Sequence, residues 1–96
     1  KDDNGIQLLN INNGHLSFKP IVKRDHDLAH VFLTNKSLEN VELRIVDQSG
    51  EELTTTRFND ELIIKRSYDL SRLPSGKYSL IIEVGNQTFT KALNVQ

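Results

Sequence analysis

The fold of this chain is decided by two stretches of sequence, residues 41–53 (VELRIVDQSGEEL) and residues 68–95 (YDLSRLPSGKYSLIIEVGNQTFTKALNV). In the first stretch, a strand-like pattern breaks at an Asp-x-x-Gly turn and a second strand pattern follows. In the second, a Leu-Pro-Ser-Gly segment leads into a strand in which apolar residues recur at every second position. Short strands of this kind, separated by tight turns, indicate an antiparallel β-sandwich.

The same reading extends over the whole chain. Eight segments have strand-like patterns: residues 6–11, 15–22, 28–34, 41–47, 51–58, 62–70, 78–84 and 87–95. Asn-Asn-Gly at 12–14 predicts a hairpin, residues 23–27 predict a charged turn, and 71–76 predict a crossing between sheets. Segment 28–34 is predicted to be a buried strand. Seven to eight strands about ten residues apart favour an all-β fold, an immunoglobulin/fibronectin-III-like antiparallel β-sandwich, over a closed barrel.

The alternation also predicts which side chains face the core. They are Val41, Leu43, Ile45, Leu62, Ile64, Tyr68, Leu70, Tyr78, Leu80, Ile82, Val84, Phe89, Leu93 and Val95. Tyr78 begins a strand directly after the crossing, so we expect a tyrosine corner, in which its hydroxyl bonds an upstream backbone group. Residues 51–58 contain three consecutive threonines and no clear apolar face, which predicts an edge strand.

The length and the net charge of the chain limit the classes to which the protein can belong. A chain of 96 residues supports a single core, so residues 1–96 are predicted to form one domain. Twelve Lys and Arg residues against thirteen Asp and Glu residues give a net charge of -1, without a block of like charge. No long-range field attracts phosphates, so nucleic acid is not an expected partner. No apolar run approaches the roughly 20 residues that a membrane helix needs, so no membrane span is expected.

Met and Cys are both absent from the sequence. It contains no Met and opens with the polar residues 1–5, which predicts a mature form from which a start signal has been removed. It contains no Cys, so neither a disulfide nor a thiolate metal site is available. A sandwich of this size must then be held together by packing alone.

Residues 41–95 resemble a known family. The matching elements are Asp47 and Gly50 of the turn, Leu70, Leu73 and Gly76 of the crossing, and Tyr78 at the start of the next strand. With this pattern the chain resembles the Por secretion (type IX) C-terminal sorting domains of Bacteroidetes. It also resembles small exported Bacteroides proteins of unknown function that have an immunoglobulin-like sandwich. The resemblance implies the sandwich fold and an exported protein, whether secreted, periplasmic or at the cell surface.

One histidine motif has the spacing of a helical metal site. His26 and His30 are four residues apart, with Asp25 and Asp27 nearby, a spacing that would bring both rings together on a helix. Segment 28–34 is predicted as a strand, however, and His15 belongs to another hairpin. We therefore expect His26 in a solvated turn, His30 in a sheet, and no metal site.

The remaining polar motifs are also read as turns. Residues 47–52 contain three carboxylates, but calcium needs about six or more oxygen ligands, so Asp47 is predicted to accept backbone N–H groups of its own turn. Ser49, Ser71 and Ser75 lack the Gly-x-Ser-x-Gly elbow of a hydrolase. Residues 35–37 (Asn-Lys-Ser) and 86–88 (Asn-Gln-Thr) fit the acceptor pattern for N-glycosylation, which in a bacterial protein is usually a coincidence. No catalytic or cofactor-binding residue, and no cofactor, is predicted.

Carbohydrate binding is the main alternative based on aromatic residues, because a sandwich can present rings to sugars. The six rings are Phe18, Phe32, Phe58, Tyr68, Tyr78 and Phe89. The alternation places Phe18, Tyr68 and Tyr78 inward, and leaves Phe58 with Phe32 or Phe89 as candidates for the surface. The sequence therefore predicts a non-enzymatic exported module for structural support or protein–protein contact, through an edge strand. The alternatives are a carbohydrate-binding module or a secretion-system sorting domain.

Overall fold

The computed structural model describes residues 19–96, so the predicted strand 6–11, the hairpin at 12–14, His15 and Phe18 lie outside the described residues. Within residues 19–96 the chain forms seven strands. They are β2 (Ile21–Asp25), β3 (Leu28–Thr34), β4 (Val41–Val46), β5 (Glu52–Phe58), β6 (Ile63–Asp69), β7 (Gly76–Val84) and β8 (Gln87–Val95). The predicted all-β, immunoglobulin-like class is confirmed.

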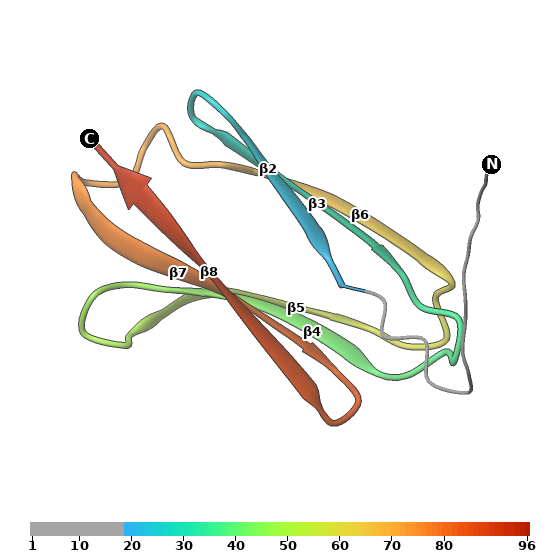
Figure 1. Cartoon of the computed structure of the whole chain (residues 1–96). Helices are drawn as coiled ribbons and strands as arrows, with labels where there is room; N and C mark the ends of the chain where they lie inside the picture. Colours follow the sequence, from blue (N-terminus) through green and yellow to red (C-terminus); the bar gives the residue numbers. More distant parts are fainter. Residues whose placement is uncertain (1–18) are drawn as a thin grey trace, which may run out of the picture.

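The strands form two antiparallel layers, which Figure 1 shows one above the other. One sheet has three strands in the order β2-β3-β6, and the other has four in the order β5-β4-β7-β8. The chain passes between the sheets after β3, after β5 and after β6. The predicted crossing at 71–76 is the last of these connections.

Alternating apolar side chains from both sheets fill the space between the layers. The buried apolar residues are Ala29, Val31, Leu33, Val41, Leu43, Ile45, Ile64, Leu70, Tyr78, Leu80, Ile82 and Leu93. Nearly all the side chains predicted to face inward belong to this core or pack against it; Val84, Phe89, Val95 and Tyr68 are partly buried at its margin. Leu62 departs from the pattern because β6 begins one residue after it, and its side chain is 52% exposed.

The turn between β2 and β3 is shorter than predicted. Residues 23–25 were predicted as part of a charged turn, but they continue β2 and pair with β3 down to Asp25 opposite Leu28. Only His26 and Asp27 form the turn, with His26 in the left-handed region at φ 54°. The charged residues concealed the strand pattern because β2 is an edge strand among the described residues, and cationic side chains at an edge remain in solvent.

Strand β3 also differs from the prediction in one respect. It was predicted as a buried strand, yet only Ala29, Val31 and Leu33 are buried, while the residues between them are at least partly exposed. One face of the three-stranded sheet therefore lies in the core and the other faces solvent, as is common in antiparallel sheets.

The segment that suggested a tyrosine corner forms one. The Tyr78 hydroxyl donates a hydrogen bond of 2.6 Å to the carbonyl oxygen of Pro74. Its ring is 8% exposed and lies over Gly76, where a Cβ would approach the ring to 3.8 Å. The Leu-Pro-Ser-Gly segment thus supplies both the acceptor and the space for the ring, and the prediction is confirmed.

Candidate functional site

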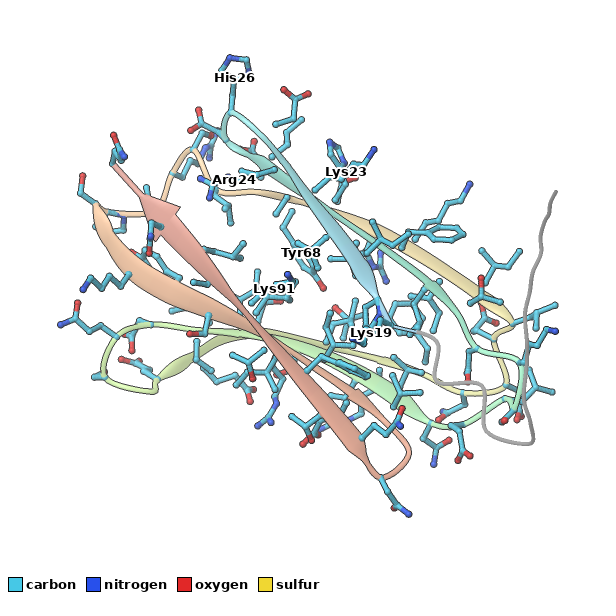
Figure 2. The ribbon with its side chains drawn as sticks, in the orientation of Figure 1. Lys19, Lys23, Arg24, His26, Tyr68 and Lys91 are labelled. Atoms are coloured by element: carbon cyan, nitrogen blue, oxygen red, sulfur yellow. The ribbon has the colours of Figure 1, made fainter. Side chains whose placement is uncertain are left out.

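His26 and His30 lie where the strand prediction placed them. His26 is at the tip of the β2–β3 turn, where its side chain points into solvent (Figure 2), with Nδ1 3.0 Å from a carboxylate oxygen of Asp25. His30 lies on the outer face of β3 and its Nδ1 is 2.7 Å from the hydroxyl of Ser67 on β6. The two rings are not brought together. No group of three or more metal-ligating side chains gathers among residues 19–96.

Asp47 holds the turn between β4 and β5. One carboxylate oxygen accepts hydrogen bonds from the backbone N–H of Ser49 and of Glu51, each 2.9 Å, and from the Ser49 hydroxyl at 2.8 Å. The Ser49 hydroxyl is the main cause that lowers the pKa of Asp47, followed by the Glu51 amide. This confirms that Asp47 is the acceptor of its own turn, as predicted from the sequence.

Asp69 has the same role at the end of β6. Its carboxylate accepts a hydrogen bond of 2.9 Å from the backbone N–H of Ser71, and this bond is the main cause that lowers the pKa of Asp69. Ser49 and Ser71 therefore belong to two separate carboxylate-held turns. The hydrogen bonds of these two turns bring neither serine into contact with a histidine.

The Asn-Lys-Ser sequence at 35–37 is structural, which the sequence pattern did not reveal. Asn35 is 3% exposed. Its Nδ2 donates to the carbonyl oxygens of Glu39 (2.8 Å) and Glu61 (3.0 Å), and its Oδ1 accepts from the backbone N–H of Glu39 (3.0 Å). The side chain ties two loops together and is not available as a glycan acceptor. Asn86, by contrast, is exposed in the β7–β8 turn.

The aromatic rings of the described residues do not form a platform for sugars. The pairing registers place Tyr68, Tyr78, Phe58 and Phe89 on the inner faces. Phe58 and Phe89, considered candidates for the surface, pack against the core. Phe32 is on the outer face of the three-stranded sheet, with the Lys65 Nζ 5.8 Å from its ring centroid.

The outer face of the four-stranded sheet carries a row of paired charges. The Arg57 Nε donates to Glu42 at 2.7 Å, the Arg44 Nε lies 3.5 Å from the same carboxylate, and an Arg44 Nη donates to Glu83 at 3.3 Å. The row crosses β5, β4 and β7 with alternating sign. The two arginines and two glutamates balance one another in charge, so the row stabilises cross-strand pairing and leaves little net charge for a ligand.

The remaining candidate surfaces are the strand edges. In the described part of the chain, β5 and β8 border the four-stranded sheet, and β2 and β6 border the other. The predicted edge position of residues 51–58 is confirmed, because β5 pairs with β4 alone. An unpaired edge offers a row of N–H and C=O groups to another extended chain.

No helix in residues 19–96 has the length and apolarity that crossing a bilayer would require.

Comparison with solved structures agrees with the architecture. The chain is similar to an immunoglobulin-like β-sandwich protein of the DUF3244 family from Bacteroides vulgatus, with a TM-score of 0.63 and 17% sequence identity. The match covers 83% of this chain and 95% of the Bacteroides protein. At this identity the likeness concerns the fold alone. Among curated proteins, none matches the chain.

Comparison with protein families is more specific. Residues 27–96, which run from the β2–β3 turn to the end of the chain, match the secretion system C-terminal sorting domain. The match includes the Asp47 turn, the crossing and the tyrosine corner described above. It extends the sequence resemblance, noted over residues 41–95, to most of the chain, and it makes the protein an exported one. The chain therefore belongs to the family of secretion system C-terminal sorting domains.

Proposed function

We propose that the 96 residues form one non-enzymatic domain that directs an exported protein to its destination by contact with a protein partner. The observation that carries the proposal is the family match over residues 27–96. In the described residues, the polar groups considered for chemistry are bound in turns and cross-strand pairs, whereas four strand edges are open. This arrangement favours recognition of the folded domain by a partner over catalysis, because catalysis needs titratable groups that converge in one cleft.

A reporter fusion tests the sorting role. A periplasm-targeted reporter is joined to the N-terminal side of residues 1–96 and produced in a Bacteroidetes host that has this secretion system. We expect most of the reporter to appear outside the cell, and to remain inside when the domain is omitted.

The folded state of the domain is tested with one core variant. Leu80 is fully buried in β7, so Leu80→Asp places an unpaired charge in the core and should unfold the sandwich. The Leu80→Asp fusion is expected to be retained like the reporter alone. Equal release of the reporter with and without the intact domain would refute the proposed function.

A further inference from the structure

One side of the sandwich is open. In the described residues the three-stranded sheet ends at β2, whereas the four-stranded sheet continues to β8. On the opposite side Arg66 of β6 stacks on Phe58 of β5, with its Cζ 5.2 Å from the ring centroid. Since β6 covers β5, the strands β2 and β8 lie together on the other side, where Figure 1 shows both at the front. No described strand pairs with the outer edge of β2 or covers β8.

The inner side of β8 is an apolar row interrupted by a cation. Lys91 pairs with the buried Leu80, so it is on the face of β8 that looks toward the other sheet. Its neighbours on this face are Phe89 and Leu93, and both belong to the core or pack against it. Lys91 itself is exposed, and in Figure 2 its side chain rises from β8 toward the three-stranded sheet.

Strand β2 repeats this arrangement from the other sheet. Val22 and Arg24 pair with the buried Val31 and Ala29, so both are on the inner face of β2. Val22 packs against the core, and Arg24 is exposed, with its Nε donating to the carbonyl oxygen of His26 at 2.8 Å. We call the surface formed by Val22, Arg24, Phe89 and Lys91 the β2–β8 opening.

The charges of these two strands are almost all positive. Strand β2 carries Lys23 and Arg24, and the charged residue of β8 is Lys91. Asp25 of β2 is the one acidic residue of these two strands, and it contacts His26. Lys19, directly before β2, adds a further cation (Figure 2). Among residues 19–96, Lys91 has no ion pair with a carboxylate.

These cations restrict what can cover the opening. A wholly apolar strand laid over β8 would bury Lys91 without a partner, which is costly. A second copy of this chain would bring its own Lys23, Arg24 and Lys91 to the same place, and like charges oppose such a contact. An inward-facing charge on an edge strand is a known device against self-association. A segment that brings a carboxylate to Lys91 avoids both costs.

We propose that an extended, acidic segment of a protein partner adds to the edge of β2 that no strand of residues 19–96 pairs with, and places a carboxylate against Lys91. The added strand would extend the three-stranded sheet to four strands and cover the partly exposed Val22 and Phe89. Main-chain hydrogen bonds to β2 would supply affinity, and the alternating acidic and apolar side chains would supply specificity. This inference rests on the proposed function, because it names the surface through which the sorting domain meets its partner.

A charge-swap titration tests the inference in the full chain of 96 residues. The probes are two capped peptides of nine residues, one alternating glutamate with valine and the other alternating lysine with valine. The wild-type domain is expected to prefer the glutamate peptide, with NMR shift changes concentrated at the amides of β2 and β8. Lys91→Glu is expected to reverse the preference, changing the ratio of the two Kd values by about tenfold, as when an attractive exposed pair becomes repulsive.

The control is Lys77→Glu, which makes the same charge change on the outer face of β7, opposite Asn94 of β8. It should leave the preference unchanged. Because the reversal is a gain of binding to the lysine peptide, an unfolded variant cannot imitate it. An unchanged preference in Lys91→Glu, or shift changes centred on β5, would overturn the inference. If the reporter fusion is still released, the proposed function stands while this surface is rejected.

Another occupant is tested in the same titration. Residues 1–18 of this chain include Asp2 and Asp3. Binding of the glutamate peptide that appears only after both aspartates are replaced by lysine would assign the opening to this chain's own segment. That result would overturn the assignment to a partner.

Discussion

At the scale of single residues, two tyrosines from the same core provide a matched comparison. Tyr78 donates to Pro74, whereas the buried Tyr68 hydroxyl has no partner among the described residues. Tyr78→Phe is therefore expected to lower the free energy of unfolding by about 1 kcal/mol. Tyr68→Phe is expected to leave it unchanged or raise it, because an unsatisfied hydroxyl leaves the interior. Urea denaturation measures the free energy of unfolding of the two variants. Equal losses of stability would contradict the tyrosine-corner assignment.

Asn35 is expected to be the most sensitive polar residue of the described fold. Its side chain makes three hydrogen bonds that join the loop after β3 to the loop before β6. Asn35→Ala removes all three of these partly buried hydrogen bonds, each of which contributes about 1 kcal/mol, so we expect a loss of about 3 kcal/mol. Asn94→Ala, at an exposed position on β8, is the control and should cost little. A thermal midpoint unchanged by Asn35→Ala would contradict the role of this residue.

Two turn carboxylates predict a dependence of stability on pH. Hydrogen bonds from Ser49 and Glu51 hold the pKa of Asp47 below its ordinary value of 3.8 in the folded protein, and Ser71 does the same for Asp69. Folding thus favours the ionised forms, so their contribution is fully present above the unfolded pKa and is lost as pH falls through the lowered folded pKa. Asp47→Asn should therefore make the free energy of unfolding fall less steeply as the pH is lowered into the acid range. An acid limb as steep as that of the wild type would contradict this account of the turn.

At the scale of elements, hydrogen exchange distinguishes edge strands from central ones. β5 pairs with β4 alone, whereas β7 pairs with both β4 and β8. Alternate amides in residues 54–56 are therefore expected to exchange quickly, while those of 80–82 should all exchange slowly. NMR exchange on a dilute monomeric sample makes the measurement. Uniformly slow exchange in residues 54–56 would mean that both sides of β5 are paired.

The strands themselves were largely predictable, and the errors have physical causes. The segments from residue 41 onward alternate clearly because one face of each is buried, so their existence and inward residues followed from the pattern. Residues 23–25 were misassigned because an edge strand keeps charged side chains in solvent. The role of Asn35 was hidden because its partners are backbone groups of residues 39 and 61, which no residue pattern reveals.

At the scale of the whole molecule, the order of strands within the sheets was the part that the sequence could not supply. Alternation shows which side chains point inward, but not which strands are neighbours, so the open side between β2 and β8 emerged only from the pairing. Lys91 illustrates the difference: in sequence it interrupts an apolar row, and within residues 19–96 it occupies the inner face of a strand at the edge of its sheet. The candidate surface is thus a product of topology rather than of a motif.

The central claim is that a folded sandwich sorts its cargo by contact at this open side. The most direct measurement is the fraction of a fused reporter released from the cell by the wild-type domain, by Lys91→Glu and by Lys77→Glu, with thermal unfolding of the three purified domains measured in parallel. The account predicts similar unfolding midpoints for all three, normal release with Lys77→Glu and strongly reduced release with Lys91→Glu. Equal release by the two variants would contradict it.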